Sequence, residues 1–177
     1  MKQRKVILFL IKFFASYFIL FVFYSLYLQK TQKKGDVFVC SPITTKVAEQ
    51  TEDVLSFFGY NVANMQHEKE MSVKLIVDGQ YIARVIEGCN SISIIILFIA
   101  FIVAFPGTLK ATLVYAVIGS ALIYIINILR IAFLTVMLHE YPDNQILLHN
   151  VIFPLIIYGF TFFLWVLWVH KFSNYKK

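Results

Sequence analysis

Three side chains with complementary chemistry lie near the ends of apolar segments of this sequence. Cys89 begins one such segment, Arg130 lies far along another, and His149 precedes a third. A cysteine becomes a strong nucleophile as a thiolate, and a nearby imidazole or guanidinium favours that form. The three residues therefore suit acyl transfer through a thioester. Cys89 would attack, His149 would act as acid and base, and Arg130, which stays protonated, would hold the thiolate or the oxyanion.

Two further residues bear on this hypothesis. Asn127 precedes Arg130 by three residues, so on a helix both lie on one face, and the amide would orient the guanidinium or a substrate carbonyl. His139 is an alternative to His149 as the base, because both histidines would lie at a similar depth on the outer side.

Each candidate also has a plain structural interpretation. Cys89 could be a small packing residue, or it could form a disulfide with Cys40, the other cysteine of the chain. Arg130 could extend its charged end to a membrane interface. The case for chemistry therefore depends on the three residues meeting at one depth.

The elements that position these residues are membrane spans. Hydrophobic residues make up 59% of the 177 residues and charged residues only 15%, which excludes an ordinary soluble domain. A spanning helix takes roughly 20 apolar residues, and we expect about four spans in a single membrane domain covering 1–177. The expected spans are about 6–28, 88–105, 111–130 with a helical extension to about 138, and 151–169.

The charges predict the orientation of these spans. The chain has a formal charge of +6, but its basic residues gather at the two ends, as the positive-inside rule expects of cytoplasmic termini, and do not form a nucleic-acid-binding face. Residues 29–87 would then lie outside the cytoplasm. Arg130 lies about 30 Å beyond Lys110 along a helix, so it would reach the outer side together with Cys89 and His149.

The outer segment 29–87 has the patterning of a small folded insertion. Thr44 or Thr45 would cap a helix that Gly59 ends. One face of this helix would carry Val47, Thr51, Val54, Leu55 and Phe58. Two alternating stretches, 72–77 and 80–86, flank Asp78-Gly79, a strong hairpin signal. The predicted fold class is therefore an all-α polytopic membrane protein with a small extracytoplasmic helix and β-hairpin between the first and second spans.

Three sequence blocks resemble those of a known family. The blocks are Glu87-Gly88-Cys89-Asn90-Ser91, Asn127-Ile128-Leu129-Arg130-Ile131, and Leu148-His149-Asn150 ahead of Pro154 and Tyr158-Gly159. In this order they resemble the Cys, Arg and His blocks of the exosortase/archaeosortase family, most closely the exosortase F branch of the Bacteroidetes. The resemblance implies Cys89, Arg130 and His149 as catalytic residues, with Asn127 and Asn90 as possible supporting residues.

The same resemblance implies a membrane-embedded cysteine transpeptidase or peptidase. Such an enzyme cleaves carboxyl-terminal sorting signals, each a motif, an apolar helix and a basic tail, and transfers the secreted protein to a surface acceptor. Its site would face the periplasm from the inner membrane. In one departure, Ser91 stands where the family commonly has glycine, and His139 matches no block. We expect no metal, cofactor or nucleic acid. The alternative class is a non-enzymatic assembly factor or a small transporter subunit.

Overall fold

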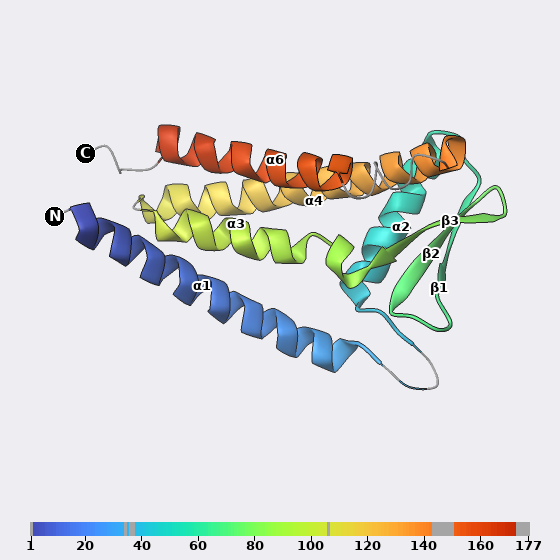
Figure 1. Ribbon diagram of the computed structural model, residues 1–177, viewed down its shortest axis with the longest axis horizontal. Helices are drawn as coiled ribbons and strands as arrows, with labels where there is room; N and C mark the ends of the chain where they lie inside the picture. Colours follow the sequence, from blue (N-terminus) through green and yellow to red (C-terminus); the bar gives the residue numbers. More distant parts are fainter. Residues whose placement is uncertain (1, 34, 36–37, 106, 143–150, 173–177) are drawn as a thin grey trace.

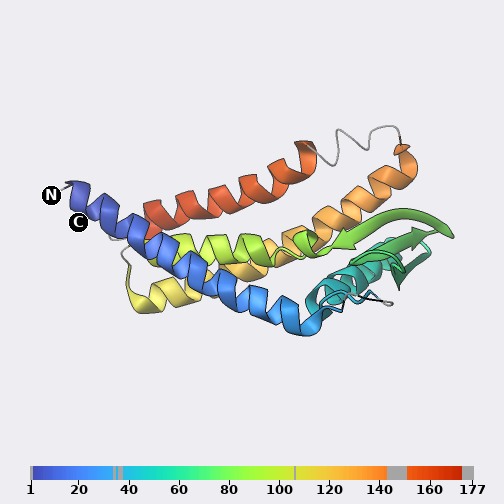
Figure 2. The same cartoon turned by 60° about the horizontal axis from the view of Figure 1, so that its bottom comes forward.

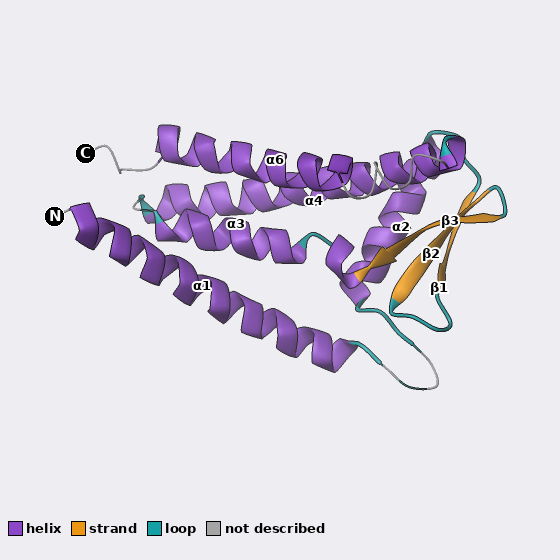
Figure 3. Ribbon diagram, viewed as in Figure 1, coloured by secondary structure: helices purple, strands orange, loops and turns teal. Residues whose placement is uncertain are grey.

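The computed structural model describes residues 2–33, 35, 38–105, 107–142 and 151–172. Most of these residues are helical, and a small sheet lies at one end of the molecule (Figure 1, Figure 3). In chain order the elements are α1 (Lys2–Thr31), α2 (Pro42–Phe57), β1 (Val62–Gln66), β2 (Ser72–Val77), β3 (Gln80–Ile86), η1 (Glu87–Cys89), α3 (Ile92–Ala104), α4 (Leu109–Glu140), α6 (Phe153–Leu167) and η4 (Trp168–Phe172).

Three of the described helical segments are long and apolar enough to cross a membrane. They are Gln3–Thr31, Leu109–Glu140 and Pro154–Phe172. The fourth apolar helix, α3, has 13 residues and is shorter than the predicted 88–105. The difference arises because residues 87–91 form a tight turn before the helix begins. The predicted third span and its extension are one continuous helix of 32 residues.

The four apolar helices run back and forth along the molecule (Figure 1). The start of α1 and the end of α6 lie at one end of the bundle, and α2 with the sheet lies at the other. Figure 2 shows α1 crossing the outer face of α3, where Phe9 contacts Phe105 at a ring-centroid distance of 4.7 Å. The bundle therefore holds both ends of the described chain away from the insertion.

A close contact between α3 and α4 forms the centre of the bundle. Phe98 of α3 is fully buried, and a Cβ atom built on Gly119 of α4 would lie 2.3 Å from its ring. Glycine at this position lets the two helices approach over an aromatic side chain. The surrounding core includes Ile102, Ile123 and Trp168.

The insertion begins with a helix whose start differs from the prediction. Ser41, not Thr44 or Thr45, caps α2, with its hydroxyl accepting from the Thr44 N–H at 3.4 Å and with Pro42 in the first turn. Pro is favoured there because its missing N–H would have no partner in the helix. Gly59, which was expected to end the helix, follows the last turn with φ of +92°. Phe58, predicted on one face with Val47 and Leu55, is 69% exposed, whereas those two residues are buried.

The predicted hairpin is present, and it belongs to a larger sheet. Asp78 and Gly79 join β2 to β3 with φ values of +50° and +79°, as the primed two-residue turns require. β1, which the sequence did not predict, adds a third antiparallel strand, giving the order β1-β2-β3. β3 is therefore an edge strand.

One face of the sheet packs on α2 and on α4. Val73, Leu75 and Val85 are buried against Val47 of α2 and Ile131 of α4. Ile131 follows Arg130 directly, so this small core fixes the insertion to the stretch of α4 that carries the candidate arginine.

Candidate functional site

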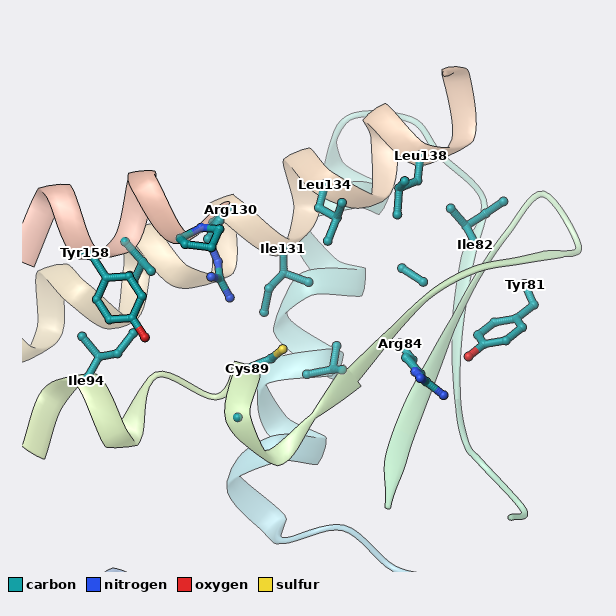
Figure 4. Close-up of a pocket in the computed structure, with 15 residues that line it drawn as sticks. Tyr81, Ile82, Arg84, Cys89, Ile94, Arg130, Ile131, Leu134, Leu138 and Tyr158 are labelled. Atoms are coloured by element: carbon teal, nitrogen blue, oxygen red, sulfur yellow. The ribbon is translucent and has the colours of Figure 1, made fainter. Parts of the chain in front are cut away.

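Cys89 lies on a tight turn between a strand and a helix. β3 ends at Ile86, η1 forms a single turn, and α3 begins at Ile92. Figure 4 shows the sulfur directed away from η1 toward α4. Cys89 is half-buried, so its thiol is partly exposed. A strand-to-helix turn presents its side chain on a fixed backbone and leaves one side open.

The turn requires an unusual backbone conformation at Ser91. This residue has φ of +64° and ψ of −7°, the left-handed region, which glycine adopts without the cost that a Cβ atom brings. The adjacent Asn90 accepts a hydrogen bond from the Ile92 N–H at 3.1 Å and so satisfies one donor of the first turn of α3. The conformation explains why glycine would suit this position.

α4 contributes two groups to the cysteine turn. The Asn127 amide donates a hydrogen bond to the Cys89 carbonyl at 2.7 Å and is almost fully buried. The Arg130 guanidinium extends toward η1 (Figure 4), where it interacts electrostatically with Cys89 and with Tyr158 of α6. Asn127 and Arg130 thus lie on one helical face, and the amide positions the backbone of the cysteine itself.

Glu87 connects the same turn to the start of α2. Its carboxylate accepts hydrogen bonds from the Ser41 N–H at 2.6 Å and the Ser41 hydroxyl at 2.8 Å, and another from the Thr44 hydroxyl. Burial alone would raise the pKa of Glu87, but these hydrogen bonds together lower it below its ordinary value. Glu87 is therefore held as a carboxylate two residues before the cysteine.

Asn90 extends this network to α1. Its amide nitrogen lies 2.8 Å from the Tyr24 hydroxyl and 3.0 Å from the Thr44 hydroxyl. Asn90 is 1% exposed, so its amide is buried where a lost partner is costly. The turn is thus held by α1, α2 and α4 together.

A cavity of about 710 Å³ opens beside the thiol. Its walls come from β3, η1, α3, α4 and α6 (Figure 4). Among the described residues, those that line the cavity include Cys89, Arg130 and Tyr158, with two arginines and no carboxylate. The cavity therefore combines a partly exposed thiol, a guanidinium and space for a bound molecule. No group of three or more His, Cys, Asp or Glu residues suited to a metal ion occurs among the described residues.

The transmembrane exosortase family (Exosortase_EpsH) matches residues 6–170. The chain belongs to this family. Neither the curated proteins nor the solved structures gave a match. Family membership supports a membrane exosortase-type role for this chain and suggests cysteine peptidase or transpeptidase chemistry.

The other predicted residues of this exosortase lie in different settings. His149 falls outside the described residues. His139 is not among the cavity-lining residues; its Nε2 lies 3.4 Å from an Asp78 carboxylate oxygen at the hairpin turn. Cys40 and Cys89 are both free thiols, so the disulfide is absent from the structure. Burial raises the pKa of the Cys40 thiol, which keeps it protonated.

Two residues of the exosortase site were not predicted by sequence reasoning. Glu87 stands in the cysteine block, and a carboxylate so close to the start of a span was a signal of a buried hydrogen-bond network. Tyr158 lines the cavity beside Arg130. The only indication of Tyr158 in the sequence was its position after the histidine block. Tyrosine is common at membrane interfaces, so this residue type alone did not indicate a site.

Proposed function

We propose that this exosortase is a cysteine transpeptidase or peptidase of the inner membrane, which cleaves carboxyl-terminal sorting signals of secreted proteins and transfers those proteins to a surface acceptor. The observation that carries the proposal is the meeting of the Cys89 thiol and the Arg130 guanidinium at the wall of one cavity. A thiol beside a fixed cation is a recognised arrangement for nucleophilic chemistry.

In the proposed first step, the Cys89 thiolate attacks the carbonyl carbon of the scissile peptide bond. The oxyanion forms within reach of the Arg130 guanidinium, which stabilises it. The carbon–nitrogen bond then breaks, and His149 gives a proton to the leaving amine. The secreted protein remains on Cys89 as a thioester, and the apolar tail departs.

In the second step, an acceptor nucleophile attacks the thioester carbonyl. His149 takes the acceptor's proton, the carbon–sulfur bond breaks, and the Cys89 thiolate is restored. Water in place of the acceptor gives hydrolysis. Neither step changes the oxidation state of any atom, so the reaction needs no redox cofactor.

The proposed topology has four membrane passes with both termini in the cytoplasm. It is supported by the bundle of Figure 1, where the start of α1 and the end of α6 lie opposite the insertion. α3 has only 13 residues, but it runs from the insertion end of the bundle toward the opposite end (Figure 1), as one membrane pass would. The insertion and the cavity would then face the periplasm. Assignment to the exosortase F branch of the Bacteroidetes is part of the same proposal.

The test is tail removal from a co-expressed secreted protein that ends in an apolar helix and a basic tail. We expect Cys89→Ala to abolish the shift in mass that tail removal produces. Cys40→Ala is the matched control, because Cys40 is also a free thiol but is buried and does not line the cavity. Undiminished removal by a folded Cys89→Ala protein would overturn the mechanism.

The same assay separates the two histidines. His149→Ala should lose tail removal if the imidazole transfers the proton. His139→Ala should retain it, because this side chain contacts the hairpin turn and does not line the cavity. The opposite pattern would assign the acid/base role to His139.

A further inference from the structure

The edge strand of the insertion forms one wall of the cavity. β3 pairs with β2 along one side, and on the other side it is the outer strand of the sheet formed by the described residues. Five consecutive residues of β3 line the cavity, from Tyr81 to Val85, and Gly88 and Cys89 continue the same wall. The cavity therefore follows the strand along its length to the thiol.

Five consecutive lining residues identify which part of β3 faces the cavity. Side chains alternate between the two faces of a strand except at a bulge, and β3 has a bulge at Ile82. One face would therefore present only some of these five residues. Here the two faces differ: Val85 and Ala83 pack toward α2, while Arg84 is exposed on the other face. Only the edge of the strand, with its backbone N–H and C=O groups, borders the cavity at every position.

The opposite wall has a different character. It is formed by Ile131, Leu134 and Leu138 of α4 and by Ile157 of α6. Figure 4 shows Leu134 and Leu138 facing β3 across the space. A backbone edge on one side and aliphatic side chains on the other suit an extended polypeptide, which needs backbone partners and has side chains to bury.

We propose that the substrate segment at the scissile bond binds as an added strand on the free edge of β3. The proposal rests on the function proposed above, since it specifies how that substrate is held. An edge strand offers unpaired N–H and C=O groups that a second strand can satisfy. The five β3 residues that line the cavity extend over roughly 16 Å, about five residues of bound peptide. Because β3 leads into η1, the added strand would bring a substrate carbonyl to Cys89.

Gly88 fits this arrangement. It lines the cavity, and a Cβ atom at this position would meet no protein atom within 4 Å. The fold itself therefore does not require glycine here. The open space above Gly88 is instead where the peptide backbone would pass on its way to the thiol.

The experiment is disulfide cross-linking in a background of Cys89→Ser and Cys40→Ala. One cysteine is placed on β3, as Tyr81→Cys or Arg84→Cys, which pair with Ile76 and Lys74 of β2 and so point to the same face of the strand. The probe is a secreted protein whose tail the unaltered enzyme removes, with single cysteines placed one at a time through the residues that precede its apolar helix. Phe57→Cys is the control, because this side chain is 84% exposed on α2 and does not line the cavity.

Strand addition predicts that cross-linking yield alternates, with maxima about two residues apart along the probe. It also predicts that the whole pattern shifts by about two residues between Tyr81→Cys and Arg84→Cys, as their partners on β2 do. Maxima about three or four residues apart, or yields no higher than with Phe57→Cys, would overturn strand addition. If the unaltered enzyme removes no tail from any candidate probe, the proposed function fails and takes the strand proposal with it.

Discussion

The hydrogen bonds of Glu87 predict a specific loss of local stability in Glu87→Gln. The carboxylate accepts from the Ser41 N–H, the Ser41 hydroxyl and the Thr44 hydroxyl, and each hydrogen bond to a charged group contributes about 1.5–3 kcal/mol. The glutamine oxygen still accepts from the Ser41 N–H, and the two hydroxyls lie 3.2 Å apart and can pair. We therefore expect a net loss of about 2 kcal/mol, close to one charge-assisted bond.

The loss should depend on pH with a defined sign. The pKa of Glu87 is lower in the folded protein than its ordinary value, so the carboxylate stabilises the fold above its unfolded pKa of about 4.3. This stabilisation disappears as the pH falls through the folded pKa. The difference in stability between the wild type and Glu87→Gln should accordingly be largest at neutral pH and shrink below about pH 4.3.

Hydrogen exchange of the α2 amides in lipid nanodiscs measures this difference as a local opening free energy. Glu70→Gln is the control, because Glu70 pairs with Arg84 on the surface, and exposed pairs contribute less than about 1 kcal/mol. Equal protection of the wild type and Glu87→Gln at pH 7 would refute the account of the cysteine turn. A loss that stays constant through the acidic range would refute the charge-based explanation.

Two further predictions concern the backbone and the bundle, and thermal unfolding in detergent checks both. Ser91→Gly should preserve or raise stability, whereas Ser91→Val should lower it by about 1–2 kcal/mol, because the position is left-handed with φ of +64°. Equal stability of these two variants would contradict that assignment. Gly119→Ala should destabilise the α3–α4 contact by about 1–3 kcal/mol, because the new Cβ meets the buried Phe98 ring. Gly159→Ala, with no atom within 4 Å of its Cβ, should be neutral, and an equal effect of both alanines would argue against close packing at Gly119.

Local signals predicted the elements that depend on local chemistry. The Asp78-Gly79 turn fixed the hairpin because two consecutive positive φ angles suit few residue pairs. Apolar length located the long helices. The predicted start of α2 was wrong. The Thr44 hydroxyl, which was expected to cap the helix, forms hydrogen bonds with Glu87 and Asn90 instead. That choice depends on residues far away in the sequence.

Tertiary pairing decided the elements that the sequence did not predict. β1 alternates weakly and carries polar Asn64 and Gln66, and it becomes a strand by pairing with β2. For the candidate site, depth and residue type selected Cys89 and Arg130, which the structure brings together. The role of Asn127 toward the Cys89 carbonyl depends on the tilt between α3 and α4, and spacing alone does not determine that tilt.

In the proposed mechanism, Cys89 forms a thioester with the secreted protein. The most direct measurement is the intact mass of the purified enzyme after incubation with a substrate whose tail it removes, with and without hydroxylamine, which cleaves thioesters. We predict an adduct equal to the tail-free substrate, lost on hydroxylamine treatment and absent from Cys89→Ala. Tail removal at an unchanged rate by folded Cys89→Ala, or an adduct that persists in that variant, would contradict the account.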